Sequence, residues 1–249
     1  MTTPVVLITG ALTGIGRATA MAFAREGARL VVSGRREEEG HKLAAELGKL
    51  GAEAEFIRSD VRHEAEIRSL VDKTVARFGR LDVAVNNAGT EGQLGPVTEQ
   101  SVDNYESTFH TNVLGTLLAM KHEMRVMSAQ QAGAIVNISS IAGQVGIAGA
   151  SVYVGSKHAV EGMTKAVALE GAAIGVRVNA VAPGPVATTM LDRFVGNNEE
   201  AKQGFLATVP AKRAATVDEI AQTIVFLASN KARFLTGQIV AVDGGYTAQ

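Results

Sequence analysis

The chain alternates between short, almost wholly apolar runs and longer segments in which apolar residues recur every three or four positions. Runs of the first kind predict strands, and their lack of polar alternation indicates strands buried on both faces of a parallel sheet. Segments of the second kind predict amphipathic helices with one face toward that sheet. Strands are predicted at 5–9, 29–33, 53–57, 81–85, 134–138, 176–181 and 238–242.

Helices are expected between these strands. They are predicted at 14–26, 37–50, 64–78, 102–127, 151–173 and 218–229, with Thr216 as the N-cap of the last. Strands that alternate with helices form a parallel sheet with helices on both faces, so the predicted fold class is α/β. In such folds, ligands bind at the carboxyl ends of the strands.

No linker, low-complexity segment or repeat interrupts the alternation, so residues 1–249 are interpreted as a single domain. The least regular stretch is 185–210, where apolar residues lie between polar ones. That pattern predicts a short amphipathic lid over the binding site, and it is also typical of a plain pair of surface helices. The apolar residues are Met190, Leu191, Phe194, Val195, Phe205 and Leu206.

The composition narrows the range of functions. A net charge of −1 and the lack of a long basic run give no electrostatic case for nucleic acid or an anionic membrane. No apolar run approaches the ~18–20 residues of a membrane span, and residues 1–4 leave no room for a signal peptide. Cysteine is absent, which excludes disulfides and fits a reducing compartment, so a cytoplasmic protein is expected. The five histidines show no ligand spacing, and no metal is predicted.

A glycine-rich turn follows the first predicted strand, in the sequence Thr9-Gly-Ala-Leu-Thr-Gly14-Ile-Gly16. Gly10 permits a tight turn, Gly14 removes a Cβ that would block a pyrophosphate, and Gly16 lets helix and strand pack closely. The helix that follows presents unpaired N–H groups and the positive end of its dipole to an anion. Strand, turn and helix together predict a phosphate-binding cradle, whereas the glycines alone would also fit an ordinary strand-to-helix turn.

A second group of residues carries candidate chemistry. Tyr153 and Lys157 are four positions apart, so on a helix they lie one turn apart on one face. An ammonium near a phenol lowers the pKa of the phenol, which is ~10 without such a neighbour. The lowered pKa makes the phenol suitable for proton transfer near neutral pH. Ser140, at the end of a predicted strand, can bind the same substrate oxygen. The Tyr–Lys pair alone would favour a plain amphipathic helix, and the glycine motif reverses that preference.

Together these motifs resemble the short-chain dehydrogenase/reductase family, in its compact subtype. The resemblance spans the chain in order, and all matches together are highly specific. They are the glycine motif, Asp60-Val61, Asn86-Asn-Ala-Gly89, Asn112, Ser140, Tyr153 with Lys157, Pro183-Gly184 and Asp243-Gly-Gly245. The resemblance implies a three-layer Rossmann-type fold with a seven-stranded parallel sheet, a nicotinamide cofactor and a homotetramer.

The resemblance also implies an oxidoreductase in which hydride passes between nicotinamide C4 and a carbinol carbon. By position, Tyr153 exchanges the proton of the substrate oxygen, and Ser140 donates a hydrogen bond to that oxygen. Lys157 is implied to lower the pKa of Tyr153 and to bind the nicotinamide ribose. Asn112 is implied to hold a water that connects Lys157 to bulk solvent; without the resemblance, it would be interpreted as a helix residue that bonds locally.

The cofactor-binding residues are likewise implied by position. Asp60 is expected at the adenine amine with Val61 beside it, Asn87 at the adenosine ribose, and Thr188 at the carboxamide. The complete implied set is Gly10, Thr13, Gly14, Ile15, Gly16, Ser33, Arg35, Asp60, Val61, Asn87, Ala88, Gly89, Tyr153, Lys157, Pro183, Gly184, Val186 and Thr188.

The end of the second predicted strand indicates which nicotinamide is used. It reads Val32-Ser33-Gly34-Arg35-Arg36, with no carboxylate before Glu37. A carboxylate there would bind the adenosine 2′-OH and repel a 2′-phosphate. Arg35 is instead placed to stack on adenine and pair with a phosphate, and Ser33 can add a hydroxyl. NADP(H) is therefore the predicted cofactor, and NAD(H) stays open because Glu38 or Glu39 can bend back to the ribose.

The predicted substrate wall is aliphatic and has no charged anchor, which favours a neutral, fairly apolar ketone or secondary alcohol as the small-molecule substrate. A sugar would need more polar groups; Glu91 and Gln93 can supply some from their loop, but they are expected to face water. The wall comprises Ile141, Ala142, Gln144, Val145, Ile147, Val186, Met190 and the apolar residues of the lid.

Three alternatives stay open. A 3-oxoacyl carrier-protein reductase of the same family is disfavoured, because Gln131 and Ile174 stand where such enzymes often place carrier-binding Arg. An NAD-linked alcohol or sugar dehydrogenase would need the other cofactor or a more polar wall. A noncatalytic NADP(H)-binding sensor would usually lack one of the Ser, Tyr and Lys residues that this chain retains.

Small and apolar residues on the predicted helix that carries Tyr153 suit either core packing or homotetramer contacts; they are Ala159, Met163, Ala166 and Val167.

Overall fold

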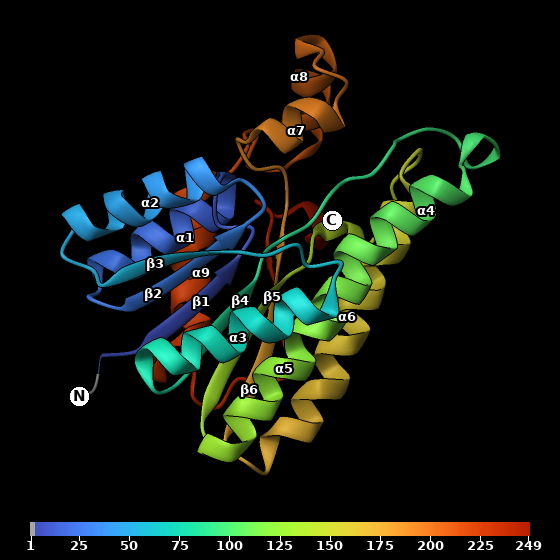
Figure 1. Ribbon diagram of the computed structural model, residues 1–249. Coiled ribbons are helices and arrows are strands. Elements are labelled where there is room, and N and C mark those ends of the chain that lie inside the picture. Colours follow the sequence, from blue (N-terminus) through green and yellow to red (C-terminus); the bar gives the residue numbers. More distant parts are fainter. Residues whose placement is uncertain (1–2) are drawn as a thin grey trace.

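A parallel sheet organises the computed structural model, which describes residues 3–249 (Figure 1). Its strands are β1 (Val5–Thr9), β2 (Arg29–Gly34), β3 (Ala54–Arg58), β4 (Val83–Asn86), β5 (Gly133–Ile138), β6 (Val176–Pro183) and β7 (Ile239–Val242). They lie in the order β3-β2-β1-β4-β5-β6-β7, and all neighbouring strands are parallel. The predicted α/β class with a seven-stranded parallel sheet is confirmed. The predicted domain also includes residues 1 and 2, which lie outside the described residues.

Helices cover both faces of this sheet, as the alternation of elements predicts (Figure 1). One face carries α1 (Gly14–Arg25), α2 (Glu37–Lys49) and α9 (Val217–Ala228), and the other carries α3 (Glu64–Phe78), α5 (Gly115–Gln130) and α6 (Ser151–Ala172). The division follows from the period of two along a strand. In β1, Val6 and Ile8 join the apolar cluster of the first face, whereas Val5 and Leu7 join that of the second.

The sheet grows in opposite directions from β1, with β2 and β3 on one side and β4 to β7 on the other. Ligands of open α/β sheets bind where the direction of growth changes, outside the carboxyl ends of the strands. Thr9, at the end of β1, lies beside Asn86, at the end of β4. The glycine turn and the loop after Asn86 therefore face each other at this edge of the sheet.

The helix predicted at 102–127 differs from a regular α-helix. It consists of α4 (Val102–Phe109), a π-helical segment (His110–Leu114) and α5, and it continues to Gln130. A π-helical turn holds one residue more than an α-helical turn and is frequent at functional sites. Asn112 lies within this segment and is buried.

Most predicted boundaries agree with the structure to within two residues, and the differences have local causes. Residues 81 and 82 precede β4, because the side chain of Gln130 takes both backbone groups of Leu81: its Oε1 accepts from the Leu81 N–H at 2.9 Å and its Nε2 donates to the Leu81 carbonyl at 2.7 Å. The predicted N-cap is confirmed, since Thr216 Oγ1 accepts from the Glu219 N–H at 3.2 Å and the Glu219 carboxylate accepts from the Thr216 N–H at 2.7 Å. That reciprocal arrangement is a capping box.

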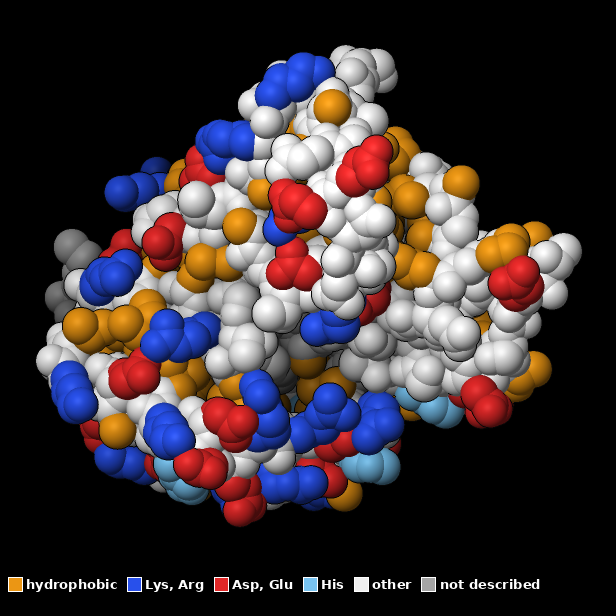
Figure 2. Space-filling model, turned by 90° about the horizontal axis from the view of Figure 1, so that it is seen from above, with side chains coloured by type: hydrophobic (Ala, Val, Ile, Leu, Met, Phe, Trp, Pro, Cys, Tyr) orange, Lys and Arg blue, Asp and Glu red, His pale blue; other side chains and the backbone are white. Residues whose placement is uncertain are grey.

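The stretch predicted as a lid forms two short helices, α7 (Thr189–Phe194) and α8 (Glu199–Thr208), above the carboxyl ends of the strands (Figure 1). Leu191 of α7 is buried, whereas α8 has no buried residue. Seen from above, the surface is hollowed beside this segment, and Lys and Arg side chains lie along one rim of the hollow (Figure 2). No helix among residues 3–249 has both the length and the apolar character that a membrane crossing requires.

Candidate active site

A cleft of about 570 Å³ runs along the carboxyl edge of the sheet, from the ends of β2 and β3 to the lid. This volume falls within the range of small-molecule and cofactor sites, ~300–1,000 Å³. Of the residues predicted for the site, all line this cleft except Gly16 and Asn112. Residues distant in sequence therefore share one cavity, and the two exceptions lie behind its wall.

The glycine turn is held by close backbone contacts. Gly10 and Gly14 have φ of 62° and 53°, a region that side chains disfavour. A Cβ on Gly16 would lie 2.4 Å from both the Gly10 carbonyl oxygen and Asn87 Nδ2. Asn87 Nδ2 donates to that same carbonyl at 2.8 Å and to the Thr9 carbonyl at 3.2 Å. Asn87 lines the cleft, and its amide nitrogen also supports the glycine turn, with Gly16 behind that turn. The contact of Asn87 with the adenosine ribose stays a prediction.

The start of α1 fits an anionic ligand. Thr13 is the N-cap residue in extended conformation, and within residues 3–249 its side chain accepts no hydrogen bond from the first turn of the helix. The first N–H groups of α1 therefore stay available, and the helix dipole favours negative charge beside them. A Cβ on Gly14 would lie 3.4 Å from Cγ2 of Thr188, which places the turn opposite the beginning of the lid. This cradle fits a pyrophosphate.

The end of the cleft beside β2 and β3, away from the lid, is lined by Arg35 and Arg62. Asp60 also lies there and is paired with Arg62 through Oδ2 and Nη2 at 2.6 Å. The Arg62 hydrogen bond lowers the pKa of Asp60 to about 2, with Arg35 adding to it by charge, while burial acts in the opposite direction. Sequence reasoning missed Arg62, although a basic residue two positions after a strand-end Asp was a visible signal.

Glu38 and Glu39, the carboxylates considered as ligands of the ribose, both form ion pairs with other side chains. Glu38 pairs with Lys42 at 2.6 Å, and Glu39 pairs with Arg36 at 3.2 Å, both within the first turns of α2. None of residues 37–39 is among the described residues that line the cleft. Arg35 does line it, next to Ser33 and Gly34.

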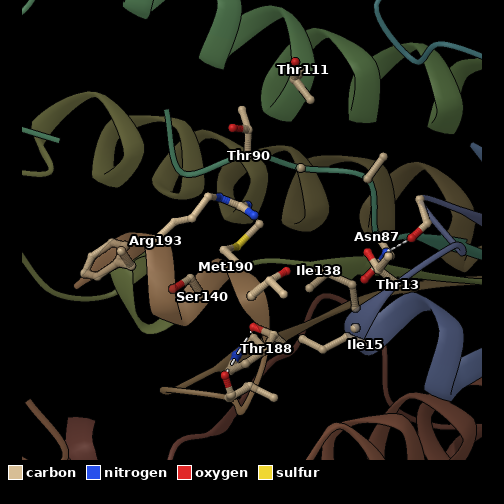
Figure 3. A pocket seen from close by; sticks show the side chains of 18 of the residues that line it. Thr13, Ile15, Asn87, Thr90, Thr111, Ile138, Ser140, Thr188, Met190 and Arg193 are labelled. Atoms are coloured by element: carbon tan, nitrogen blue, oxygen red, sulfur yellow. Dashed lines mark hydrogen bonds between the residues drawn. The ribbon is translucent and has the colours of Figure 1, made fainter. Parts of the chain in front are cut away.

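Ser140 and Tyr153 line the cleft at its lid end, and Ser140 points into the pocket (Figure 3). Tyr153 is buried on α6, and Lys157 Nζ lies 5.7 Å from the centroid of its ring. Burial raises the pKa of Tyr153 to about 12, with the nearby Ser140 hydroxyl acting in the opposite direction and the Glu91 charge adding to the rise. Burial lowers the pKa of Lys157 to about 8, and the Glu161 charge opposes that change. The expected lowering of the phenol pKa by Lys157 is not found in this arrangement.

Asn112 is hydrogen-bonded to two parts of the site, the loop after β4 and α6. Its Nδ2 donates to the Thr90 carbonyl at 2.8 Å and to Ser156 Oγ at 3.0 Å, and its Oδ1 accepts from the Thr90 N–H at 2.8 Å. A Cβ on Gly89 would lie 3.3 Å from Asn112 Oδ1 and 3.6 Å from Lys157 Nζ. Asn112 therefore fixes the loop after β4 against α6, close to Lys157, and both hydrogens of its amide are given to protein groups.

The substrate end departs from the predicted wall in two ways. Ile141, Ile147, Val186 and Met190 line the cleft, but Ala142 is fully buried and Gln144 and Val145 lie outside the lining. From the lid, Leu191, Phe194 and Phe205 take part, together with one charged residue.

That charged residue is Arg193, which extends from α7 toward the loop that carries Thr90 (Figure 3). Arg193 Nε donates to Glu91 Oε1 at 2.5 Å, and Nη2 donates to Oε2 at 3.2 Å. The predictions that Glu91 faces water and that the wall has no charged group were wrong. Glu91 is buried because the lid covers it and supplies its partner.

The fold is of the Rossmann type and the cleft lies at the carboxyl edge of its sheet, and comparison with known proteins gives the family. Residues 10–247 match the family model described as enoyl-(acyl carrier protein) reductase. The chain belongs to the short-chain dehydrogenase/reductase family. The resemblance inferred from the motifs is confirmed.

Individual relatives support the same reaction class. The cis-4-hydroxycyclohexanecarboxylate dehydrogenase of Sinomonas cyclohexanicum is 41% identical over 98% of this chain and 96% of its own. The solved structure of ElxO with NADP bound has a TM-score of 0.94 and 35% identity and covers 100% of both chains. The NAD⁺-bound xylitol dehydrogenase structure has a TM-score of 0.94 and 32% identity over 97% of this chain and 98% of that one. The protein is thus an oxidoreductase of the alcohol and ketone class with a nicotinamide cofactor.

Proposed function

We propose that this protein is an NADP(H)-preferring oxidoreductase that interconverts a ketone and a secondary alcohol, with Tyr153 as the acid and base. The observation that carries the proposal is that Ser140 and Tyr153 line the same cleft as the glycine cradle, with Lys157 beside them. A bound nicotinamide supplies the hydride chemistry at its C4 atom. Residues 1–249 then act as one domain, with 185–210 as the lid of its substrate site.

The side chains divide the remaining work. The phenol of Tyr153 donates its proton to the substrate carbonyl oxygen in reduction and accepts the hydroxyl proton in oxidation. Burial raises the pKa of Tyr153 to about 12, which opposes release of the proton, so a nearby positive charge has to offset that effect. Ser140 donates a hydrogen bond to the same oxygen and stabilises the charge that develops there. Lys157 binds the nicotinamide ribose and, when protonated, favours release of the proton by Tyr153. Asn112 keeps this group in place from behind.

The preference for NADP(H) rests on the basic end of the cleft. Arg35 and Arg62 line it, and the carboxylates of Glu38 and Glu39 pair with cations of α2 and its N-cap. A 2′-phosphate would thus meet guanidinium groups, and the remaining carboxylate, Asp60, is already paired. The relatives carry both kinds of nicotinamide, so the choice has to be measured.

Paired titration with NADPH and NADH, followed by nicotinamide fluorescence, tests the proposal. We expect NADPH to bind more tightly, and Arg35→Ala to weaken NADPH much more than NADH. Lys42→Ala, which removes an exposed cation from the same helix outside the cleft, is the matched control and should leave both affinities unchanged. Tighter NADH binding would reject the cofactor preference, and binding of neither nucleotide would reject the enzymatic proposal.

The substrate proposal is a neutral ketone or secondary alcohol, because Ile141, Ile147, Met190, Phe194 and Phe205 make most of the lid end apolar. Two alternatives have direct tests. Much faster reduction of acetoacetyl thioesters than of simple ketones would favour a 3-oxoacyl carrier-protein reductase. Faster oxidation of polyols with NAD⁺ would favour an NAD-linked alcohol or sugar dehydrogenase.

A homotetramer is proposed on the exposed apolar side chains of the helices that carry the site. Val102 is 70% exposed and Leu169 80% exposed, and Tyr105 and Leu117 are exposed as well. Of the residues first considered for such contacts, Met163 and Val167 pack on the core instead. Light scattering on the purified protein should give the mass of four chains, and the mass of one chain would reject this assembly. A cytoplasmic location also stays a prediction.

A further inference from the structure

The ion pair of Arg193 with Glu91 uses only some of the N–H groups of its guanidinium. Its Nε and Nη2 atoms donate to the two oxygens of Glu91, and among residues 3–249 no acceptor lies within hydrogen-bond distance of Nη1. The Arg193 side chain is 53% exposed, whereas that of Glu91 is 8% exposed. The carboxylate therefore lies behind the guanidinium, and the guanidinium faces the cleft.

The surroundings of Arg193 place it at the substrate end of the cleft. The next residue, Phe194, packs edge-on against the Tyr153 ring at 6.2 Å, and Phe205 stacks on Phe194 at 6.2 Å. Met190, one turn before Phe194 on the same helix, lines the cleft as well. A substrate whose oxygen reaches Tyr153 thus contacts an apolar wall that includes a single guanidinium.

The charge of that guanidinium is balanced. Glu91 forms two hydrogen bonds with Arg193, so the pair has no net charge. A substrate carboxylate at Arg193 would share the guanidinium with the Glu91 carboxylate, and the two like charges would repel. An uncharged acceptor avoids this repulsion, and a guanidinium N–H left without a partner when substrate excludes water is costly. The pair therefore discriminates against both an anion and a purely apolar group.

We propose that Arg193 and Glu91 form a specificity subsite for an uncharged hydrogen-bond acceptor, a second carbonyl or a hydroxyl, on the ketone or alcohol substrate. This inference rests on the proposed function and specifies its substrate class as a diketone, hydroxyketone or the corresponding diol. Arg193 Nη1 is the donor, and Glu91 is a positioning residue that orients the guanidinium and cancels its charge.

The test compares NADPH-dependent reduction of cyclohexanone, 4-hydroxycyclohexanone and 4-oxocyclohexanecarboxylate, which share a ring and a reacting carbonyl. We expect the wild-type protein to prefer the hydroxyketone over cyclohexanone by about tenfold or more in kcat/KM, as one hydrogen bond to a charged donor provides. Arg193→Met should remove that preference. Glu91→Gln leaves a net positive guanidinium and should raise kcat/KM for the oxocarboxylate relative to the hydroxyketone by about tenfold.

Control variants, and the outcomes that would contradict the subsite, distinguish a failure of the subsite from a failure of the proposed function. Arg125→Met removes an exposed guanidinium paired with Asp72 outside the cleft and should change no ratio. If Glu91→Gln does not fold, Arg193→Lys, which retains the charge without the planar fork, should also lower the hydroxyketone preference. Equal kcat/KM for cyclohexanone and the hydroxyketone, a wild-type preference for the oxocarboxylate, or an Arg193→Met variant altered only in NADPH affinity would overturn the subsite while leaving the reaction intact. Reduction of none of the three ketones by protein that binds NADPH would overturn the proposed function as well.

Discussion

Lys157 donates a hydrogen bond of 2.9 Å from Nζ to the carbonyl oxygen of Ile138. Ile138 is the last residue of β5, two positions before Ser140, and Lys157 is one helical turn after Tyr153. The bond therefore ties the helix that carries the phenol to the strand end that carries the hydroxyl. Burial lowers the pKa of the ammonium to about 8, so its proton is held less firmly than on a surface lysine.

Lys157→Met should lower both turnover and cofactor affinity. The substitution keeps most of the aliphatic volume but removes the bond to Ile138 and the proposed contact with the nicotinamide ribose. Steady-state kinetics and fluorescence titration with NADPH measure the two effects separately. A loss of turnover with unchanged NADPH affinity would contradict the ribose contact and leave Lys157 with the strand tie alone.

Tyr153→Phe should reduce kcat by roughly 10²–10⁴-fold, the usual contribution of a positioned proton donor. The ring keeps its edge contact with Phe194, 6.2 Å away, so the fold and the apolar wall persist. NADPH affinity should therefore stay close to that of the wild-type protein. Retained turnover on a ketone that the wild-type protein reduces would show that another group supplies the proton.

Gly16→Ala should abolish cofactor binding without unfolding the sheet. The new Cβ would lie 2.4 Å from the Gly10 carbonyl and from Asn87 Nδ2, so the turn or the loop after β4 must move. Gly162→Ala, on α6, is the matched control, because among residues 3–249 no heavy atom beyond its chain neighbours and the nearby backbone of its own helix lies within 4 Å of its added Cβ. The control should bind NADPH normally and gain roughly 0.5–1 kcal/mol of stability in urea from the better helix propensity of alanine. Normal NADPH affinity in the Gly16 variant would contradict the cradle.

Local sequence patterns predicted those parts of the molecule whose structure is determined by residues close together in the sequence. Buried strands read as apolar runs, and the glycine turn and strand-end residues follow from them by the geometry of parallel sheets. The N-cap of α9 at Thr216 was also predicted from neighbouring residues, since a capping box is complete within four residues.

Contacts between distant segments were not foreseen. Glu91 and Arg193 are 102 positions apart, and nothing near either residue announces its partner. The π-helical turn at Asn112 was also missed, because the sequence of 102–127 was interpreted as one regular helix. Asn87 illustrates a third case: its position at a strand end was predicted, but its amide bonds to the turn it faces, which only the fold reveals.

Glu123 is a buried acid that the proposed reaction does not use. It lies on α5, where Asn86 Nδ2 donates to its Oε2 at 3.0 Å and also to Asn137 Oδ1 at 3.0 Å. Burial raises the pKa of Glu123 to about 7, with the Asn86 hydrogen bond acting in the opposite direction. Asn86 Oδ1 is buried without a hydrogen-bond partner within residues 3–249, so a donor at position 123 has an acceptor close by.

Glu123→Gln should therefore stabilise the protein above pH 7 and not at pH 5. The folded-state pKa is above the unfolded value of 4.5, so the folded protein keeps a proton that the unfolded chain releases, and wild-type stability falls as pH rises from about 4.5 to about 7. The loss is on the order of 3 kcal/mol, and an amide, which does not titrate, avoids it. Urea unfolding at pH 5 and pH 8 measures the effect, with the exposed Glu170→Gln on α6 as the control that should show no such difference. Equal free energies of unfolding for wild-type and Glu123→Gln protein at pH 8 would mean that the core accommodates the charged carboxylate without cost.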